Sequence, residues 1–212
     1  MTSTPSIHLH EGDLPEGLTF ADAQDGAVAV DSETMGLIPY RDRLCVVQLS
    51  GGDGEAHLVR LAPGRYDAPR LKAVLTDPSL LKIFHFARFD VAAFMHWLDV
   101  ETTPVYCTKI ASKLARTYTD RHGLKDVVRE LAGVELSKQQ QSSDWGAETL
   151  SEAQAAYAAS DVLHLHAVRR RLDAMLAREG RAALARASFD YVPVRARLDL
   201  LGYAEGDLFA HR

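Results

Sequence analysis

The sequence has little cysteine and no long apolar run. Its 212 residues include two cysteines, Cys45 and Cys107, which cannot form a disulfide framework and fit a reducing compartment. No apolar run approaches the roughly 18 residues that a membrane-spanning helix requires. The first residues lack a cationic segment followed by an apolar one, so no signal peptide is visible. These absences predict a cytoplasmic protein that does not associate with a membrane.

The chain also lacks an excess of basic residues. Its 24 Lys+Arg stand against 29 Asp+Glu, and the net charge of −5 argues against a broad surface that wraps nucleic acid. The charge is uneven, because residues 109–138 hold seven basic and four acidic side chains. Two interpretations of this +3 stretch stay open: a solvated helix face, or a local anion site beside an acidic one.

The composition is that of an ordinary globular domain, with 47% hydrophobic and 25% charged residues. A chain of this length buries most of its surface without needing disulfides or metals for stability. We find no internal repeat, linker or low-complexity segment. We therefore expect a single domain over residues 1–212.

Short apolar runs rich in β-branched residues predict five strands. They are expected at residues 27–33, 43–50, 56–61, 81–86 and 105–107. The first three follow one another, with hairpin-type glycines before the third, which predicts an antiparallel meander. Helical spacing is expected at residues 68–75, 88–98, 109–118 and 123–131. This order is typical of an α/β fold with a mixed five-stranded sheet flanked by helices.

The second half of the chain is predicted to be mainly helical. The polar residues 134–148 are not expected to form regular structure. One long helix should begin after Ser151, which suits an N-cap, and should run toward Arg178. A further helix over residues 181–191 should end near Pro193.

The C-terminal tail is more apolar than a free chain end. Residues 198–209 carry several leucines together with Tyr203 and Phe209. Apolar surface of this kind is usually covered. We therefore expect the chain from about residue 180 onward to dock on the body of the protein or on another subunit.

Two acidic residues end the first predicted strand. Asp31 and Glu33 are spaced i, i+2, which points both carboxylates to the same side of a strand. Like charges this close repel each other unless a cation lies between them. The ordinary alternative is a solvated strand end, with Ser32 and Thr34 forming a turn.

Two further carboxylates are expected near the same sheet edge. Asp90 lies in the first turn of a helix that follows a predicted strand, where complementarity to the helix dipole alone would explain it. Tyr157 and Asp161 share one face of an apolar helix, because they are four residues apart. An aspartate buried there without a partner is costly, which favours a ligand or strong hydrogen bonds.

Together, four carboxylates on three elements form an oxygen-rich set that suits Mg²⁺ or Mn²⁺. Two such ions close together activate water and stabilise the leaving oxygen when a phosphodiester is cleaved. The hydroxyl of Tyr157 would orient the attacking water. The residues alone therefore predict a site for two divalent metal ions.

Three segments carry a family resemblance: VDSETMGL, HFARFD and YAASD. In order and spacing they resemble the three motifs of the DEDD 3′–5′ exonucleases, in the subgroup with tyrosine in the last motif. KQQQSSDW is similar to the loop before the last motif in ribonuclease D-like enzymes. The resemblance covers residues 28–171 and implies a ribonuclease H-like fold. It also implies that Asp31, Glu33, Asp90 and Asp161 are metal ligands and that Tyr157 orients the water.

Within this family the chain resembles the short ribonuclease D-like enzymes of alphaproteobacteria, which degrade very short RNAs and assemble into rings of eight. Full-length ribonuclease D carries further helical nucleic-acid-binding domains after the catalytic one. This sequence has about 50 residues beyond Asp161, enough only for helices and a tail. The resemblance thus implies short RNA as substrate, with DNA an open alternative, and a homo-oligomer such as an octameric ring.

Six more residues are candidate substrate contacts: Thr34, Leu37, His85, Lys138, Gln141 and Trp145. Leu37 resembles the leucine that wedges between terminal bases, and core packing is the alternative. His85 resembles the family's histidine before the second motif, and capping of the strand is the alternative. The last three would contact phosphate or base, unless they belong to an ordinary polar surface loop.

The sequence therefore predicts a metal-dependent 3′–5′ exonuclease that releases nucleoside 5′-monophosphates from short oligoribonucleotides, dinucleotides included. A less selective exonuclease on longer RNA or DNA is one alternative. An alternative of another class is a non-catalytic nucleic-acid-binding or assembly module on the same fold. Four clustered negative charges argue against that module, because pure binding of a polyanion does not require them.

Overall fold

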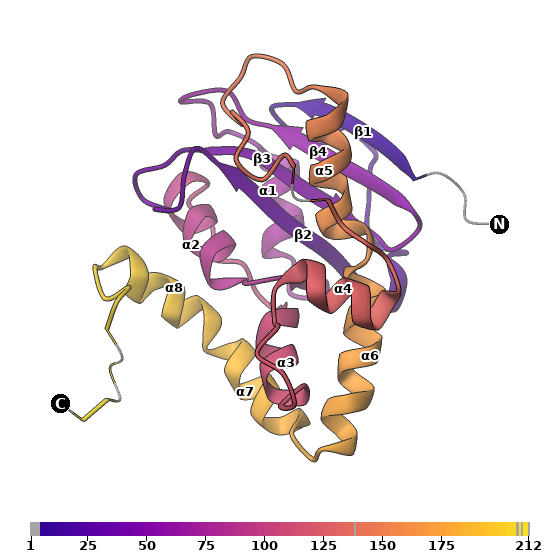
Figure 1. Ribbon diagram of the computed structural model, residues 1–212. Helices are drawn as coiled ribbons and strands as arrows, with labels where there is room; N and C mark the ends of the chain where they lie inside the picture. Colours follow the sequence, from indigo (N-terminus) through magenta and orange to yellow (C-terminus); the bar gives the residue numbers. More distant parts are fainter. Residues whose placement is uncertain (1–4, 138, 207, 209, 212) are drawn as a thin grey trace.

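The computed structural model describes residues 5–137, 139–206, 208 and 210–211. Within these residues, six strands form one mixed sheet in the order β1-β4-β3-β2-β5-β6 (Figure 1). The strands are β1 (Ser6–Glu11), β2 (Ala27–Thr34), β3 (Leu44–Ser50), β4 (Glu55–Arg60), β5 (Leu81–Phe84) and β6 (Val105–Cys107). A single 3₁₀ turn, Gln24–Gly26, leads into β2.

The sheet confirms the predicted meander and adds one strand to it. β2, β3 and β4 are antiparallel neighbours, while β5 and β6 run parallel to β2 on its other side. The prediction of five strands was wrong, because β1 pairs in parallel with β4 at the opposite edge. β1 has the sequence SIHLHE and is mostly exposed, so no apolar run marked it as a strand.

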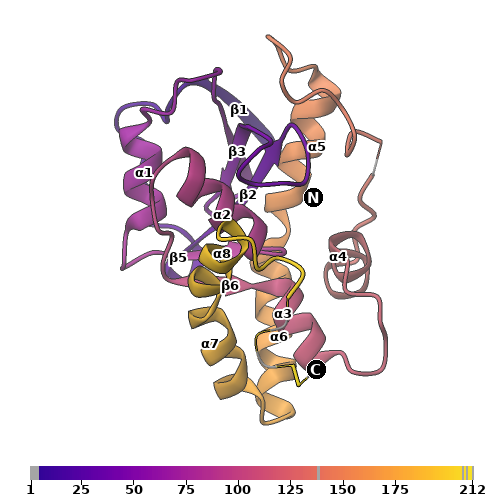
Figure 2. The same cartoon turned by 90° about the vertical axis from the view of Figure 1, so that its left-hand side faces the viewer.

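Helices cover both faces of the sheet. They are α1 (Pro69–Thr76), α2 (Arg88–Trp97), α3 (Thr108–Ala115), α4 (Leu124–Ala132), α5 (Glu152–Leu163), α6 (Leu165–Arg178), α7 (Ala182–Asp190) and α8 (Val192–Leu200). α1 and α2 lie on one face, and α5 crosses the other (Figures 1 and 2). The central strand β2 is therefore covered on both sides, and residues 27–30 are fully buried.

The helix predicted from Ser151 to Arg178 is two helices, α5 and α6, which meet at His164. The predicted N-cap is confirmed. The Ser151 hydroxyl accepts a hydrogen bond from the backbone N–H of Gln154 at 3.2 Å, and the Gln154 side-chain oxygen accepts one from the backbone N–H of Ser151 at 3.0 Å. This reciprocal capping box fixes the start of α5, the helix that carries Tyr157 and Asp161.

The helix predicted to end near Pro193 is followed directly by another helix. α7 ends at Asp190, and α8 begins at Val192 with Pro193 in its first turn, where a missing N–H costs no helical hydrogen bond. α8 packs against α2, and the Arg88 guanidinium donates hydrogen bonds of 2.8 and 2.6 Å to the Asp199 carboxylate. This part of the C-terminal region therefore docks on the body of the protein.

The tail beyond α8 leaves large apolar side chains exposed. Leu201, Tyr203 and Leu208 are each at least half exposed, and Phe209 lies outside the described residues. No described helix combines the length and the apolar character needed to cross a membrane.

Candidate active site

Strand alternation brings two acidic side chains of β2 to one face of the sheet. Asp31 and Glu33 point toward α5, and Asp161 of α5 faces them. One carboxylate oxygen from each of these three residues lies within 4.8 Å of the other two. The predicted meeting of β2 and the YAASD helix is thus present, in a geometry that three ligands of one cation can adopt.

Asp90 lies beside this group but on the other face of β2. It is in the first turn of α2, 3% exposed, and its Oδ1 accepts a hydrogen bond of 2.6 Å from the Ser32 hydroxyl. Ser32 points away from Asp31 and Glu33, since successive strand residues alternate. The Ser32 hydroxyl thus holds the Asp90 carboxylate beside the cluster, where its charge helps to raise the pKa of Asp31 and Glu33.

Burial raises the pKa of all four carboxyls, and repulsion from neighbouring carboxylates adds to it for Asp31, Glu33 and Asp90. Burial is the largest cause for each, and it raises the pKa of Asp90 and Asp161 to about 7. The charges of Asp161 and Asp90 add to burial and raise the pKa of Glu33 to about 9. The pKa of Asp31 also lies well above its usual range, through burial and then the charges of Asp90, Asp161 and Glu33.

The donor set fits a hard divalent cation. All the donors are carboxylate oxygens, which Mg²⁺ and Mn²⁺ prefer, and no cysteine or histidine belongs to this group of described residues. Full ionisation of so tight a cluster requires a compensating positive charge nearby. A divalent cation held among Asp31, Glu33 and Asp161 would supply that charge.

Tyr157 stands one helical turn before Asp161 on α5. Burial raises the pKa of its hydroxyl, and the charges of Asp161, Glu33 and Asp31 raise it further, so the phenol keeps its proton. Its ring packs near Trp145, with a ring-centre distance of 6.0 Å. A neutral phenol in this place can donate a hydrogen bond to a water beside the carboxylates.

Asp31, Glu33 and Asp161 line a cavity of about 680 Å³, which is within the size range of ligand-binding clefts. Five of the six candidate substrate contacts line it: Thr34, Leu37, His85, Gln141 and Trp145. The sixth, Lys138, lies outside the described residues. The structure thus gathers residues from the β2–β3 loop, the end of β5 and the loop before α5 around one space.

The structure bears on the alternative interpretations of three of these residues. Leu37 is 87% exposed, so it does not pack in the core. Trp145 is 3% exposed and forms part of the cavity wall, which excludes a polar surface loop at this position. His85 is bonded through Nδ1 to the Thr108 hydroxyl at 2.8 Å, and burial lowers its pKa to about 3, so the ring stays neutral.

Motif-based reasoning did not single out Lys109 and Lys125, which line the same cavity. The Lys109 ammonium lies 4.3 Å from the centre of the Phe86 ring, and burial, followed by the charge of Lys113, lowers its pKa. The positive stretch at residues 109–138 was the available signal. Of its two interpretations, an anion site beside the acidic one agrees better with these positions.

The residues match known proteins along most of the chain. A family model described as 3′–5′ exonuclease matches residues 13–177, which include Asp31, Glu33, Asp90 and Asp161. Ribonuclease D of Gluconacetobacter diazotrophicus is 40% identical over 154 residues, which are 73% of this chain and 39% of that protein. The chain thus spans about two fifths of the length of the curated relatives that it matches.

Solved structures agree with these sequence matches. NrnC of Brucella melitensis bound to pGG is 53% identical, with a TM-score of 0.92 over 98% of this chain and all of that one. The same protein with bound Mg²⁺ is 52% identical, with a TM-score of 0.91 over 98% of this chain and all of that one. RNase D of Escherichia coli is 28% identical, with a TM-score of 0.72 over 81% of this chain and 45% of that one.

These likenesses confirm the ribonuclease H-like fold that the motifs implied. The matched region holds VDSETMGL, HFARFD and YAASD in the expected order, on β2, α2 and α5. The chain belongs to the 3′–5′ exonuclease family, among its ribonuclease D-like members and close to NrnC.

Proposed function

We propose that residues 1–212 act as one metal-dependent 3′–5′ exonuclease domain that hydrolyses short oligoribonucleotides, dinucleotides included, to nucleoside 5′-monophosphates. The observation that carries this proposal is the meeting of Asp31, Glu33 and Asp161 within 4.8 Å at the base of an open cavity. The relatives support it, since NrnC of Brucella melitensis has been solved with pGG and with Mg²⁺.

The proposed chemistry assigns a task to each residue. Asp31, Glu33 and Asp161, together with Asp90, would hold two divalent cations. Bound Mg²⁺ or Mn²⁺ supplies Lewis-acid activation of a water and stabilisation of the leaving 3′ oxygen. The Tyr157 hydroxyl holds that water in line. The water oxygen would bond to phosphorus as the P–O3′ bond breaks, with one water proton lost to solvent and a solvent proton taken up by the leaving O3′, which leaves a 5′-monophosphate and a strand one nucleotide shorter.

The cavity walls favour a short nucleic acid. Leu37 stands exposed at the cavity, where a terminal base can stack against it, and Lys109 and Lys125 offer positive charge to phosphates. The chain as a whole carries a charge of −5, which disfavours holding a long strand by electrostatics alone. A few local contacts in a cavity of about 680 Å³ suit a substrate of a few nucleotides.

Timed digestion of 5′-labelled RNAs from two to about twenty nucleotides tests this proposal. We expect stepwise loss from the 3′ end in Mg²⁺ or Mn²⁺, fastest for the shortest RNAs, and no turnover in EDTA. Asp31→Asn and Asp161→Asn should be inactive and folded. Full turnover in EDTA would contradict the metal mechanism. Equal rates at all lengths would favour the less selective exonuclease, and no turnover with any metal would favour a binding module.

Replacing Tyr157 with Phe tests the role of the phenol. The ring can still pack near Trp145, so the protein should fold normally, but the water loses its hydrogen-bond donor. Because groups that position or transfer protons typically contribute about 10²–10⁴-fold, kcat should fall by that factor. Tyr66→Phe is a matched control, since it removes a phenol hydroxyl outside the cavity. An unchanged kcat would mean that Tyr157 serves only in packing.

The raised carboxyl pKa values predict how stability depends on pH. These carboxyls have a pKa of about 7 to 9 in the folded protein and near 4 in the unfolded chain, so the folded protein binds more protons. The free energy of unfolding therefore falls as the pH rises through that interval. Metal-free Asp31→Asn should therefore melt above the wild type at pH 8, and the difference should shrink toward pH 4. Mg²⁺ should raise the melting temperature of the wild type at pH 8 and not that of the variant.

Scanning fluorimetry with EDTA or with Mg²⁺ measures both effects. Glu16→Gln is a control, because it neutralises an exposed carboxyl outside the cavity. A metal-free Asp31→Asn protein that melts below the wild type at pH 8 would show that repulsion does not limit stability.

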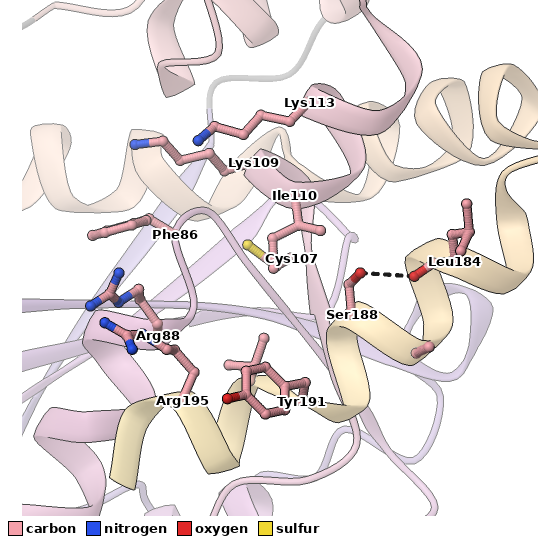
Figure 3. Close-up of a pocket in the computed structure, with 12 residues that line it drawn as sticks. Phe86, Arg88, Cys107, Lys109, Ile110, Lys113, Leu184, Ser188, Tyr191 and Arg195 are labelled. Atoms are coloured by element: carbon pink, nitrogen blue, oxygen red, sulfur yellow. Dashed lines mark hydrogen bonds between the residues drawn. The ribbon is translucent and has the colours of Figure 1, made fainter. Parts of the chain in front are cut away.

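We also propose that the chain forms a homo-oligomer, such as an octameric ring, through the region from about residue 180. Leu184, Val194 and Leu201 are each at least half exposed on or directly after α7 and α8. Leu184 stands at a second cavity of about 550 Å³ between α3 and α7–α8 (Figure 3). Apolar side chains line this cavity, together with Lys109 and Lys113. An apolar area on a protein surface is typical of an interface with another chain.

Light scattering coupled to size exclusion tests the assembly. We expect the mass of several chains, and a lower mass for Leu184→Lys or Leu201→Lys, because a charge at either position disrupts an apolar contact. Leu9→Lys, at an exposed leucine of β1, is the comparison. If the wild type has the mass of one chain, the protein is not an oligomer. If both variants keep the wild-type mass, this surface is not the interface.

A further inference from the structure

Gln48 is a buried amide whose side chain has no hydrogen bond within the described residues. It lies on β3 next to β2 and is 0% exposed, yet neither its Nε2 nor its Oε1 has a partner in the part of the chain that the structure describes. Burying an unpaired amide is costly, and most buried polar groups in proteins are paired. A residue of this kind in the middle of a sheet therefore requires an explanation beyond packing.

The register of the sheet places Gln48 directly opposite Asp31. β2 and β3 are antiparallel, and Asp31 pairs with Gln48 across the ladder. Residues that face each other in this way point to the same side of the sheet, with Cβ atoms about 4.5–5.5 Å apart. Since the Ser32 hydroxyl reaches Asp90 on the opposite face, Asp31 and Gln48 both lie on the face that α5 covers.

The other strand neighbour of Gln48 offers nothing to bond. On β4 it faces Leu58, which is apolar and fully buried. Ala29, the residue two positions before Asp31 on the same face of β2, is also apolar and buried. Of the side chains directly across from Gln48, that of Asp31 alone can accept a hydrogen bond from the amide.

We propose that Gln48 is a positioning residue for Asp31, whose carboxylate its amide holds, directly or through one buried water, in the orientation that binds the metal ion. This inference rests on the proposed function, because it takes Asp31 as a metal ligand. Partners that hold the outer oxygen of a ligating carboxylate fix its direction, and losing one typically weakens metal binding about 10–100-fold. Gln48 does not line the cavity, so it would act through Asp31.

Gln48→Met tests the proposal, because methionine keeps the unbranched shape of glutamine and removes both polar atoms. Calorimetric titration of the metal-free proteins with Mn²⁺ should show binding weakened about 10–100-fold in the variant. The metal-free melting temperature should stay equal or rise, since an unpaired buried amide has been removed. A purely structural Gln48 predicts unchanged Mn²⁺ affinity, which is the outcome that would overturn the proposal.

Thr102→Val is the matched control. Thr102 is also 0% exposed, and its Oγ1 has no partner among the described residues; it lies in the connection before β6, outside the cavity. Its replacement should leave Mn²⁺ affinity at the wild-type value. If the wild type itself binds no Mn²⁺, the proposed function fails. If the wild type binds Mn²⁺ and Gln48→Met binds it equally, only the present inference fails.

A measurement on the unmodified protein covers the case in which Gln48→Met does not fold. The side-chain amide signals of Gln48, assigned through bonds in a ¹⁵N-labelled sample, should shift as Mg²⁺ is titrated in and should saturate with the binding curve. Signals that stay in place while Mg²⁺ binds would overturn the proposal.

Discussion

Repulsion among carboxylates at the end of β2 is the constraint on which the site depends. Asp31 and Glu33 face α5, while Ser32 between them holds Asp90 on the α2 side, so one strand assembles negative charge on both of its faces. The fold buries Asp90 and partly buries the other carboxylates, and their pKa values rise accordingly. The rest of the protein must therefore hold this cluster together against its own repulsion until a cation relieves it.

The two helices after the polar loop supply much of that restraint. The capping box at Ser151 and Gln154 fixes the start of α5, and the ring of His166, at the start of α6, is hydrogen-bonded through Nε2 to the Ala27 carbonyl of β2 at 3.0 Å. Asp161 lies between these two anchors. The break at His164 separates α5, which crosses the sheet, from α6, which packs against α3, so one sequence segment can serve both the site and the helical layer.

Local sequence patterns predicted the features of the fold that depend on interactions between residues close together in the sequence. Strand alternation placed Asp31 and Glu33 on one side, helical spacing paired Tyr157 with Asp161, and Ser151 marked a helix start. β1 was missed because an exposed edge strand pairs with β4, some fifty residues away, without an apolar run of its own. The direction of Asp90 toward Ser32, and the place of Lys109 at the cavity, depend on tertiary packing that no spacing rule contains.

The arrangement of charge also separates an enzyme from a binding module on the same fold. A phosphodiester that enters the cavity meets Lys109 and Lys125 at its walls and three carboxylates at its base. The lysines attract the polyanion, whereas unneutralised carboxylates repel it at the very point where its end would lie. A protein that only bound nucleic acid would gain affinity by losing those acids. The partial burial of these acids therefore makes physical sense when a divalent cation is bound, because the cation makes the base of the cavity attractive to the phosphodiester. The same cation is the group that can activate water.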